Sequence, residues 1–294
     1  MSAESLPVDA AAYPAPAQPL ARRAEKFVTP CGSGTMSWHV WGEGEPLVLL
    51  HGGSGSWTHW LRNLDELARQ HRVFAADLPG LGESDEAPRR FDPTDLMGSV
   101  AHWAELVGAG IEQLTAGPFH LAGFSLGSII GARMAAQQWP AIRSLTVIGG
   151  ASMGMPWAGL RGRLQPMDAT MSEAQCLAAQ SHNLGVMMLH NVDAIDDGAA
   201  ALQLHNARRA RIRSHPLADG DVLRRCIPHI RVALTFVWGS RDLYALPDLD
   251  GRIAYVRGFH PAARIEIIEG GGHWVMYERA RACTAAILAA AACA

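Results

Sequence analysis

The chain has 294 residues, of which 49% are hydrophobic and 18% are charged, and its formal net charge is −3. This length can hold one large domain or a core with an inserted segment, and the composition excludes a disordered protein. The charge gives no electrostatic basis for binding nucleic acid or an anionic membrane, and no apolar run is long enough to span a bilayer.

The N-terminal residues 1–25 are rich in alanine and proline and have little periodicity, which predicts a mobile or loosely attached arm. They contain no compact apolar core with basic flanks, so we expect no signal peptide and predict a cytoplasmic protein. Two β-like pieces follow, at 26–29 and 35–41, joined by the glycine-containing segment 31–34. They predict an antiparallel hairpin.

From residue 46 onward, short apolar runs alternate with amphipathic stretches. The run 46–50 is continuously apolar, as is typical of a strand buried on both faces. Further strands are predicted at 72–76, 119–122, 144–148, 232–238 and 263–268, and helices at 57–70, 94–114, 129–138 and 279–292. This alternation predicts an α/β fold with a mostly parallel sheet and helices on both faces.

The alternation stops between residues 152 and 228, where helix-like segments at 172–188 and 199–213 occur without a buried-strand run. A helical insertion at this point would lie over the carboxyl ends of the strands, where ligands bind in open α/β sheets. We therefore predict a helical lid of residues 152–228, inserted into a core domain of residues 26–151 and 229–294.

A nucleophile-elbow pattern, Gly123-x-Ser125-x-Gly127, stands between the strand at 119–122 and the helix at 129–138. A serine hydroxyl is a weak nucleophile, so it must be held clear of the backbone, near a base and beside oxyanion donors. A sharp strand-to-helix turn does this, and its crowding favours glycine two residues before and after the serine. Ser125 is the predicted nucleophile.

Two further residues after strands complete a triad. Asp242 follows the strand at 232–238, and His273 lies on a glycine-rich loop after the last strand. The chain order serine, aspartate, histidine is the one expected of elbow-type serine hydrolases. His273 would be the base and Asp242 would fix its tautomer. Asp248 and Asp250 are nearby alternatives for the acidic member.

The oxyanion hole needs two N–H donors. The elbow geometry supplies Leu126, and the loop after the strand at 46–50 supplies the second donor. Gly53 is our choice, with Ser54 next, because close backbone approach favours residues without bulk. His51 is interpreted as a residue that braces this loop, not as a base.

The chain resembles the α/β-hydrolase fold superfamily from about residue 26 to its end. Five motifs in chain order carry the resemblance: His51-Gly52-Gly53, Asp77-Leu78-Pro79-Gly80-Leu81-Gly82-Glu83-Ser84, Gly123-Phe124-Ser125-Leu126-Gly127, Gly239-Ser240-Arg241-Asp242 and Gly272-His273-Trp274. The resemblance implies a sheet of about eight strands with the lid inserted after the sixth.

The subfamily is less sharply marked. Gly272-His273-Trp274-Val275 resembles the meta-cleavage-product hydrolases, which cut carbon–carbon bonds in ring-fission products. In those enzymes an asparagine precedes the nucleophile, whereas Phe124 stands there in this chain, which favours ester cleavage. The loop also differs from the Gly-Gly-Pro-Gly of proline iminopeptidases, and Ser125 in place of aspartate excludes a haloalkane dehalogenase. A haloperoxidase-like side activity stays open.

Several side chains are candidates for substrate binding. Arg208 and Arg211 are three residues apart and are predicted to share a helix face, where a guanidinium could hold a substrate carboxylate. A solvated basic surface is the alternative interpretation of this pair. The other candidates are Ser54, Phe124, Trp157 and Trp274.

We therefore predict a serine hydrolase of small to medium carboxylic esters. A C–C hydrolase of dienoate ring-fission products is the main alternative, and a non-catalytic small-molecule-binding hydrolase fold is the next. Five scattered cysteines form no C-x-x-C pair, so neither a disulfide framework nor a metal site is expected. No cofactor is predicted; the expected partner is a small-molecule substrate, and a homo-oligomer is left open.

Overall fold

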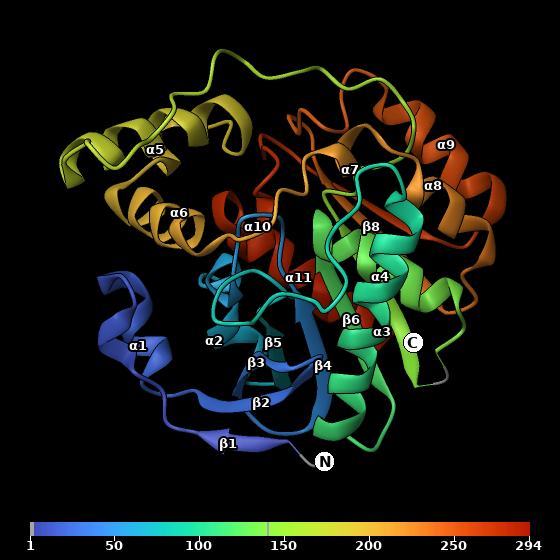
Figure 1. Cartoon of the computed structure of the whole chain (residues 1–294). Helices are drawn as coiled ribbons and strands as arrows, with labels where there is room; N and C mark the ends of the chain where they lie inside the picture. Colours follow the sequence, from blue (N-terminus) through green and yellow to red (C-terminus); the bar gives the residue numbers. More distant parts are fainter. Residues whose placement is uncertain (1–2, 140) are drawn as a thin grey trace.

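The structure, a computed structural model, describes residues 3–139 and 141–294. Within them one nine-stranded sheet runs in the order β1-β2-β3-β5-β4-β6-β7-β8-β9 (Figure 1). Pairings from β1 to β5 are antiparallel and those from β5 to β9 are parallel. The strands are β1 Glu4–Leu6, β2 Glu25–Cys31, β3 Gly34–Trp41, β4 Glu45–Leu50, β5 His71–Ala76, β6 Phe119–Phe124, β7 Ile142–Ile148, β8 Ala233–Gly239 and β9 Arg264–Ile268. The predicted α/β class and mostly parallel sheet are confirmed, with one strand more than the eight expected.

Helices cover both faces of the sheet. The longer ones are α3 Leu96–Leu114, α4 Leu126–Ala136, α5 Glu173–Met187, α6 Asp197–Arg209, α9 Leu249–Phe259 and α11 Ala280–Ala292. The shorter turns are η1 Ala10–Ala12, η2 Ala15–Ala17, α1 Gln18–Ala21, η3 Trp57–Trp60, α2 Leu64–Leu67, η4 Val192–Ala194, α7 Pro216–Asp219, α8 Val222–Cys226, η5 Ile227–His229 and α10 Val275–Glu278. No helix of residues 3–139 or 141–294 is both long and apolar enough to cross a membrane.

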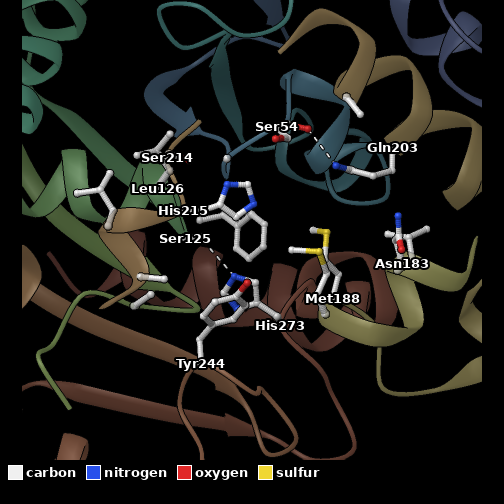
Figure 2. Close-up of a pocket in the computed structure, with 18 of the residues that line it drawn as sticks. Ser54, Ser125, Leu126, Asn183, Met188, Gln203, Ser214, His215, Tyr244 and His273 are labelled. Carbon is white, nitrogen blue, oxygen red and sulfur yellow. Dashed lines mark hydrogen bonds between the residues drawn. The ribbon is translucent and has the colours of Figure 1, made fainter. Parts of the chain in front are cut away.

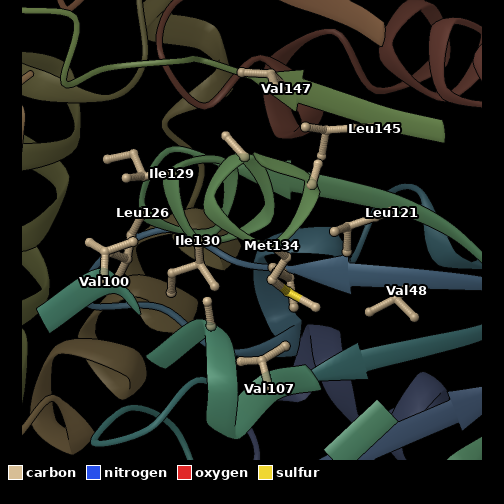
Figure 3. Close-up of a cluster of buried hydrophobic side chains, with 14 of the residues drawn as sticks. Val48, Val100, Val107, Leu121, Leu126, Ile129, Ile130, Met134, Leu145 and Val147 are labelled. Atoms are coloured by element: carbon tan, nitrogen blue, oxygen red, sulfur yellow. The ribbon is translucent and has the colours of Figure 1, made fainter. Parts of the chain in front are cut away.

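Two hydrophobic cores lie on the two faces of the sheet. Along β4, Val48 and Leu50 belong to the core with α3 and α4, whereas Leu47 and Leu49 belong to the core with α2 and α11. Figure 3 shows the first of these cores, with Val48 facing the helices. Successive side chains of a strand point to opposite faces, so a strand between two helical layers must be apolar throughout. The run at 46–50 has this pattern.

The predicted helix at 57–70 is the main difference among the core elements. The structure forms the tight turn η3, then a break, then α2. All four side chains of η3, from Trp57 to Trp60, are buried. A regular α-helix would turn one of these side chains outward, so the tighter turn satisfies the burial.

Helix α9 was not predicted, because Gly251 and Gly258 weaken its helical pattern.

The N-terminal residues, predicted as a mobile arm, are attached to the body of the protein. β1 pairs with β2 at the edge of the sheet. Tyr13 is buried, and its hydroxyl hydrogen-bonds to Nε2 of His39 at 3.0 Å. The indole N–H of Trp41 donates to the carbonyl of Leu20 at 3.0 Å. A few tertiary anchors therefore hold a segment whose composition suggests no fixed structure.

The segment between β7 and β8 is helical, as the sequence predicts, but α6 ends at Arg209 and not at residue 213. Ala210 has an extended backbone, and the N–H of Arg211 donates to the carbonyl of Gly80 at 2.9 Å. Docking against the Gly80 loop thus replaces the last helical turn. The start of α5 is fixed by a capping box between Ser172 and Gln175.

Candidate active site

Ser125 occupies the sharp turn between β6 and α4. Its backbone has φ 49° and ψ −111°, a strained conformation for a residue with a side chain. A Cβ on Gly123 would overlap the carbonyl of Gly127, and a Cβ on Gly127 would overlap the carbonyl of Leu50. Glycine is therefore required at both positions, and the strained turn lifts the Ser125 hydroxyl away from the sheet.

The structure brings Ser125, His273 and Asp242 into one hydrogen-bonded chain. His273 Nε2 lies 3.0 Å from Ser125 Oγ, and His273 Nδ1 lies 3.0 Å from each carboxylate oxygen of Asp242. A carboxylate only accepts, so Nδ1 carries the proton and Nε2 is free to accept from the serine hydroxyl. Asp242 is fully buried and His273 is nearly so.

The alternative aspartates lie elsewhere. Asp248 is the N-cap of α9 and accepts from the N–H of Gly251 at 3.0 Å. Asp250 lies in the first turn of the same helix. Neither carboxylate hydrogen-bonds to His273, so Asp242 alone of the three aspartates occupies the acidic position.

The loop that carries His273 is held by Glu278 of α10. The Glu278 carboxylate accepts from the N–H of Gly272 at 2.6 Å and from the N–H groups of His190, at 3.0 Å, and Asn191. These contacts join the histidine loop to the segment after α5. The backbone before the imidazole is thereby fixed, and after it the N–H of Trp274 donates to the carbonyl of Met188 at 2.8 Å.

Two buried histidines shape the loop after β4. His51 Nε2 accepts from the N–H of Leu78 at 2.9 Å, so its Nδ1–H donates to the carbonyl of Gly52 at 2.7 Å. His59 Nδ1 accepts from the N–H of Gly52 at 3.3 Å, and its Nε2–H donates to Gln203 Oε1 at 3.1 Å. Burial lowers the pKa of His51 to about 3 and that of His59 to about 4. Both rings are neutral hydrogen-bonding braces.

A pocket of about 290 Å³ opens over Ser125. It is lined by the predicted residues Gly53, Ser54, Phe124, Ser125, Leu126 and His273. The rest of its wall is contributed mainly by the segment between β7 and β8 and includes Leu164, Met167, Gln180, Asn183, Leu184, Met187, Met188, Gln203, Ser214, His215 and Leu217, together with Tyr244. Figure 2 shows Ser125, His273 and Tyr244 grouped apart from Asn183 and Gln203.

The two arginines predicted to bind substrate lie outside the pocket over Ser125. Because α6 ends at Arg209, Arg208 and Arg211 do not share a helix face. Arg208 pairs with Glu173 at 2.7 Å on the exposed surface, and Arg211 donates to the carbonyl of Ser84. Neither lines the pocket over Ser125.

The two predicted tryptophans also lie outside the pocket wall. Trp274 is fully buried, and its indole N–H donates to the carbonyl of His59 at 3.0 Å. Trp157 stacks on Tyr244 with ring centroids 5.0 Å apart. Each therefore supports a residue at the site without reaching its cavity.

Sequence reasoning missed Tyr244 and most of the wall. Tyr244 stands two residues after Asp242, and its N–H donates to Asp242 Oδ1 at 2.9 Å. That proximity in the chain was the available signal. The methionines and amides of the wall gave no such signal, because only the packing of α5 and α6 brings them to Ser125.

Comparison with known proteins agrees with this geometry. Residues 47–286 match the sequence model of the alpha/beta hydrolase family. The chain belongs to this family. As an alpha/beta hydrolase it is an enzyme of the hydrolase class, and the fold expected from the five motifs is confirmed.

Two relatives illustrate the breadth of the family. The dihydrolipoyllysine-residue acetyltransferase component of the acetoin cleaving system of Pseudomonas putida is 28% identical to this chain over 249 residues. The match covers 81% of this chain but only 60% of that protein. The 2-hydroxy-6-oxo-6-phenylhexa-2,4-dienoate hydrolase of Comamonas testosteroni is 26% identical to this chain over 257 residues. The match covers 81% of this chain and 85% of that enzyme.

Solved structures share the fold at low identity. Naproxen esterase (carboxylesterase NP) from Bacillus subtilis superposes with a TM-score of 0.70 at 18% identity, covering 95% of this chain and 93% of that one. A meta-cleavage product hydrolase from Pseudomonas fluorescens IP01 superposes with a TM-score of 0.70 at 15% identity, covering 90% of this chain and 96% of that one. These two solved structures superpose on this chain equally well, so the fold does not choose between an esterase and a C–C hydrolase.

Proposed function

We propose that this alpha/beta hydrolase cleaves small to medium carboxylic esters through an acyl-enzyme on Ser125. The observation that carries the proposal is the hydrogen-bonded chain Ser125–His273–Asp242 at the wall of a mainly apolar pocket. Ser125 Oγ attacks the ester carbonyl while His273 Nε2 takes its proton and then returns it to the leaving alcohol. Asp242 stabilises the imidazolium, and a water activated by His273 then releases the acid.

Gly53 and Leu126 are the proposed oxyanion donors. Both line the pocket beside Ser125. Within residues 3–139 and 141–294, neither backbone N–H has a hydrogen-bond acceptor in the protein. Leu126 is the first residue of α4, where the helix dipole favours negative charge. Two free donors beside the nucleophile support stabilisation of the tetrahedral intermediate.

The pocket favours a neutral acyl group. Among its lining residues in the described chain there is no lysine, arginine, aspartate or glutamate. Two of its three amides are engaged: Asn183 exchanges two hydrogen bonds with Gln165, and Gln203 bonds to His59 and to the carbonyl of Ser54. An apolar acyl chain fits this wall without leaving a buried charge unpaired.

The same wall argues against the C–C hydrolase alternative. A dienoate carries a carboxylate, which an arginine would hold bidentately. The two candidates for that role, Arg208 and Arg211, lie outside the pocket. Phe124, which precedes the nucleophile, lines the pocket with an apolar ring where an amide was expected for C–C hydrolysis. Ester cleavage is therefore the better-supported reaction.

The segment 152–228 is proposed to act as a lid. It contributes Leu164, Met167 and Met188 to the pocket. Methionine side chains adapt to ligands of differing shape. A cover of this kind would exclude water from the acyl group while leaving the alcohol free to depart.

Intact-mass analysis after treatment with a fluorophosphonate tests the nucleophile. A single adduct is expected on the wild type, none on Ser125→Ala, and a full adduct on Ser33→Ala, which changes an exposed serine of the β2–β3 turn. Hydrolysis of p-nitrophenyl butanoate by the wild type and not by Ser125→Ala would complete the test. An unlabelled but folded wild type would contradict the proposal.

A further inference from the structure

A second cavity, of about 660 Å³, lies beside the active-site pocket. It is lined by Trp103 of α3, by residues 86, 87, 89–91 and 93 from the loop before α3, and by residues 211–213, 215 and 216 from the stretch that leads from α6 into α7. Figure 1 shows this loop passing next to α7. We call this cavity the arginine groove, since its lining includes Arg89, Arg90, Arg211 and Arg213.

The groove and the pocket share a wall. His215 lines both cavities, and Ser214 next to it lines the pocket, whereas Arg211 and Arg213 line the groove. Figure 2 shows Ser214 and His215 close to Ser125. One extended stretch of chain thus separates the two cavities, so a ligand bonded to Ser125 needs to extend only past His215 to enter the groove.

Charge is divided sharply between the two cavities. The pocket wall carries no arginine or lysine, while the groove has four guanidinium groups against one carboxylate, that of Glu86. Arg89 forms an ion pair with Asp95 at 3.1 Å, and the Arg211 guanidinium donates to the carbonyl of Ser84. In the part of the chain that the structure describes, Arg90 and Arg213 have no ion-pair or hydrogen-bond partner. Two cations are therefore free to receive an anion.

The floor of the groove is apolar. The ring of Phe91 stacks on Trp103, with centroids 5.4 Å apart and planes 12° apart. Ile212, Pro93 and Pro216 extend this surface. An inorganic ion would leave this apolar surface exposed to water. An organic anion would cover it with its apolar part while its charged groups contact the arginines.

We propose that the arginine groove binds the phosphate-bearing leaving group of an activated acyl substrate, an ester or a thioester, whose neutral acyl part enters the pocket. Arginine pairs bidentately with phosphate, and several guanidinium groups match a leaving group with more than one phosphate charge. The proposal rests on the proposed acyl-enzyme reaction. Ser125 Oγ takes the acyl group, the phosphorylated alcohol or thiol departs with the proton from His273, and water then releases the acid.

Two thioesters with the same acyl group test the groove. Butanoyl-coenzyme A carries phosphates on its leaving group, and butanoyl-N-acetylcysteamine is a neutral truncated form of it. The wild type should prefer the first in kcat/KM, because a cationic surface raises the capture of anionic substrates about tenfold or more. Arg90→Ala/Arg213→Ala should lose most of this preference and keep its rate on the neutral thioester.

The matched control is Arg257→Ala/Arg281→Ala, which removes two exposed arginines outside the groove and changes the net charge equally. It should keep the wild-type preference. An unchanged preference in Arg90→Ala/Arg213→Ala, or an equal loss in the control, would overturn the groove assignment. Hydrolysis of the neutral thioester by the wild type reports the proposed function separately, since that probe does not need the groove.

A binding measurement separates phosphate from carboxylate. Free coenzyme A titrated into Ser125→Ala by calorimetry should bind, and the same protein with Arg90→Ala and Arg213→Ala should bind at least about tenfold more weakly. Citrate offers several carboxylates without phosphate and should bind weakly to both. Citrate binding as tight as coenzyme A would overturn the assignment to phosphate.

Discussion

The ring of Tyr244 packs against the imidazole of His273, with centroids 4.3 Å apart. Phe124 lies 5.0 Å from the same imidazole, centroid to centroid. Two aromatic rings therefore pack against the histidine while Asp242 fixes its tautomer. Tyr244 is a positioning residue in this arrangement, because its ring packs on His273 and its backbone N–H donates to Asp242.

Tyr244→Ala should lower kcat by roughly 10- to 100-fold, since a displaced base loses its alignment with the nucleophile. Tyr244→Phe keeps the ring and should retain most of the activity. Steady-state hydrolysis of p-nitrophenyl butanoate measures both variants. Equal losses in the two would show that the hydroxyl, and not the packing of the ring, is what matters.

The Asp242 carboxylate should be needed for the correct histidine tautomer. Asp242→Asn preserves the size of the side chain but offers an N–H where Nδ1–H must donate, and kcat should fall by about 10³- to 10⁴-fold. Asp248→Asn is the matched control, because Asp248 caps α9 and does not contact His273. A comparable loss in Asp248→Asn would contradict the assignment of Asp242.

Glu278 should contribute to stability through its carboxylate. Glu278→Gln keeps one carbonyl oxygen for three backbone N–H donors and brings an NH₂ group against them. The free energy of unfolding should fall by about 1.5–3 kcal/mol, the size of hydrogen bonds to a charged group. Urea unfolding measures this. Glu266→Gln, which disrupts a partly exposed pair with Arg264, should change it by less than about 1 kcal/mol.

The buried histidines should make the fold sensitive to acid. Burial lowers the pKa of His59 from 6.5 to about 4. Between these values the unfolded state binds the proton and the folded state does not, so stability falls as pH falls through this window. One such group contributes about 1.4 kcal/mol per pH unit.

His59→Gln should therefore flatten the dependence of unfolding free energy on pH between 6.5 and 4 by roughly that amount. His229→Gln, at an exposed histidine, should leave the slope unchanged. Urea unfolding at several pH values gives both slopes. An unaltered slope in His59→Gln would mean that other groups, such as His51, dominate the acid response.

The sheet and the positions of Ser125, Asp242 and His273 after its strands were predictable from the sequence because they depend on local pattern. The apolar run at 46–50 became β4, and the glycines around Ser125 marked its strained turn. Most of the pocket wall was not predictable, because it depends on where segments meet. The two candidate arginines show this: Arg211 lies past the end of α6, where its N–H donates to the carbonyl of Gly80, and Arg208 pairs with Glu173 on the exposed surface.

Attachment of the N-terminal segment has the same explanation. Its alanines and prolines carry no periodicity, and its position is set by single contacts such as Tyr13 with His39. Composition averages over such contacts. A segment held by two or three buried side chains is therefore indistinguishable by sequence from a mobile one.

The oxyanion loop and the shared wall of the two cavities should be coupled through Gly53. A Cβ added at Gly53 would lie 2.5 Å from Ser214 Oγ, closer than side-chain atoms approach one another. The overlap involves the hydroxyl alone, since Ser214 Cβ lies 3.9 Å from the added atom, and rotation of the hydroxyl relieves part of it. Gly53→Ala should therefore lower kcat, but by less than the about 10²-fold cost of losing one oxyanion donor. Removing the obstructing hydroxyl with Ser214→Gly should restore much of the activity that Gly53→Ala loses.

Ser214→Gly alone is the reference for this pair and should hydrolyse p-nitrophenyl butanoate at nearly the wild-type rate. The double-variant cycle then measures the coupling between the two positions. A strong positive coupling places the defect of Gly53→Ala in the contact with Ser214. Additive losses would instead mean that the added methyl group blocks the oxyanion itself, because removal of the Ser214 hydroxyl would then not relieve the defect of Gly53→Ala.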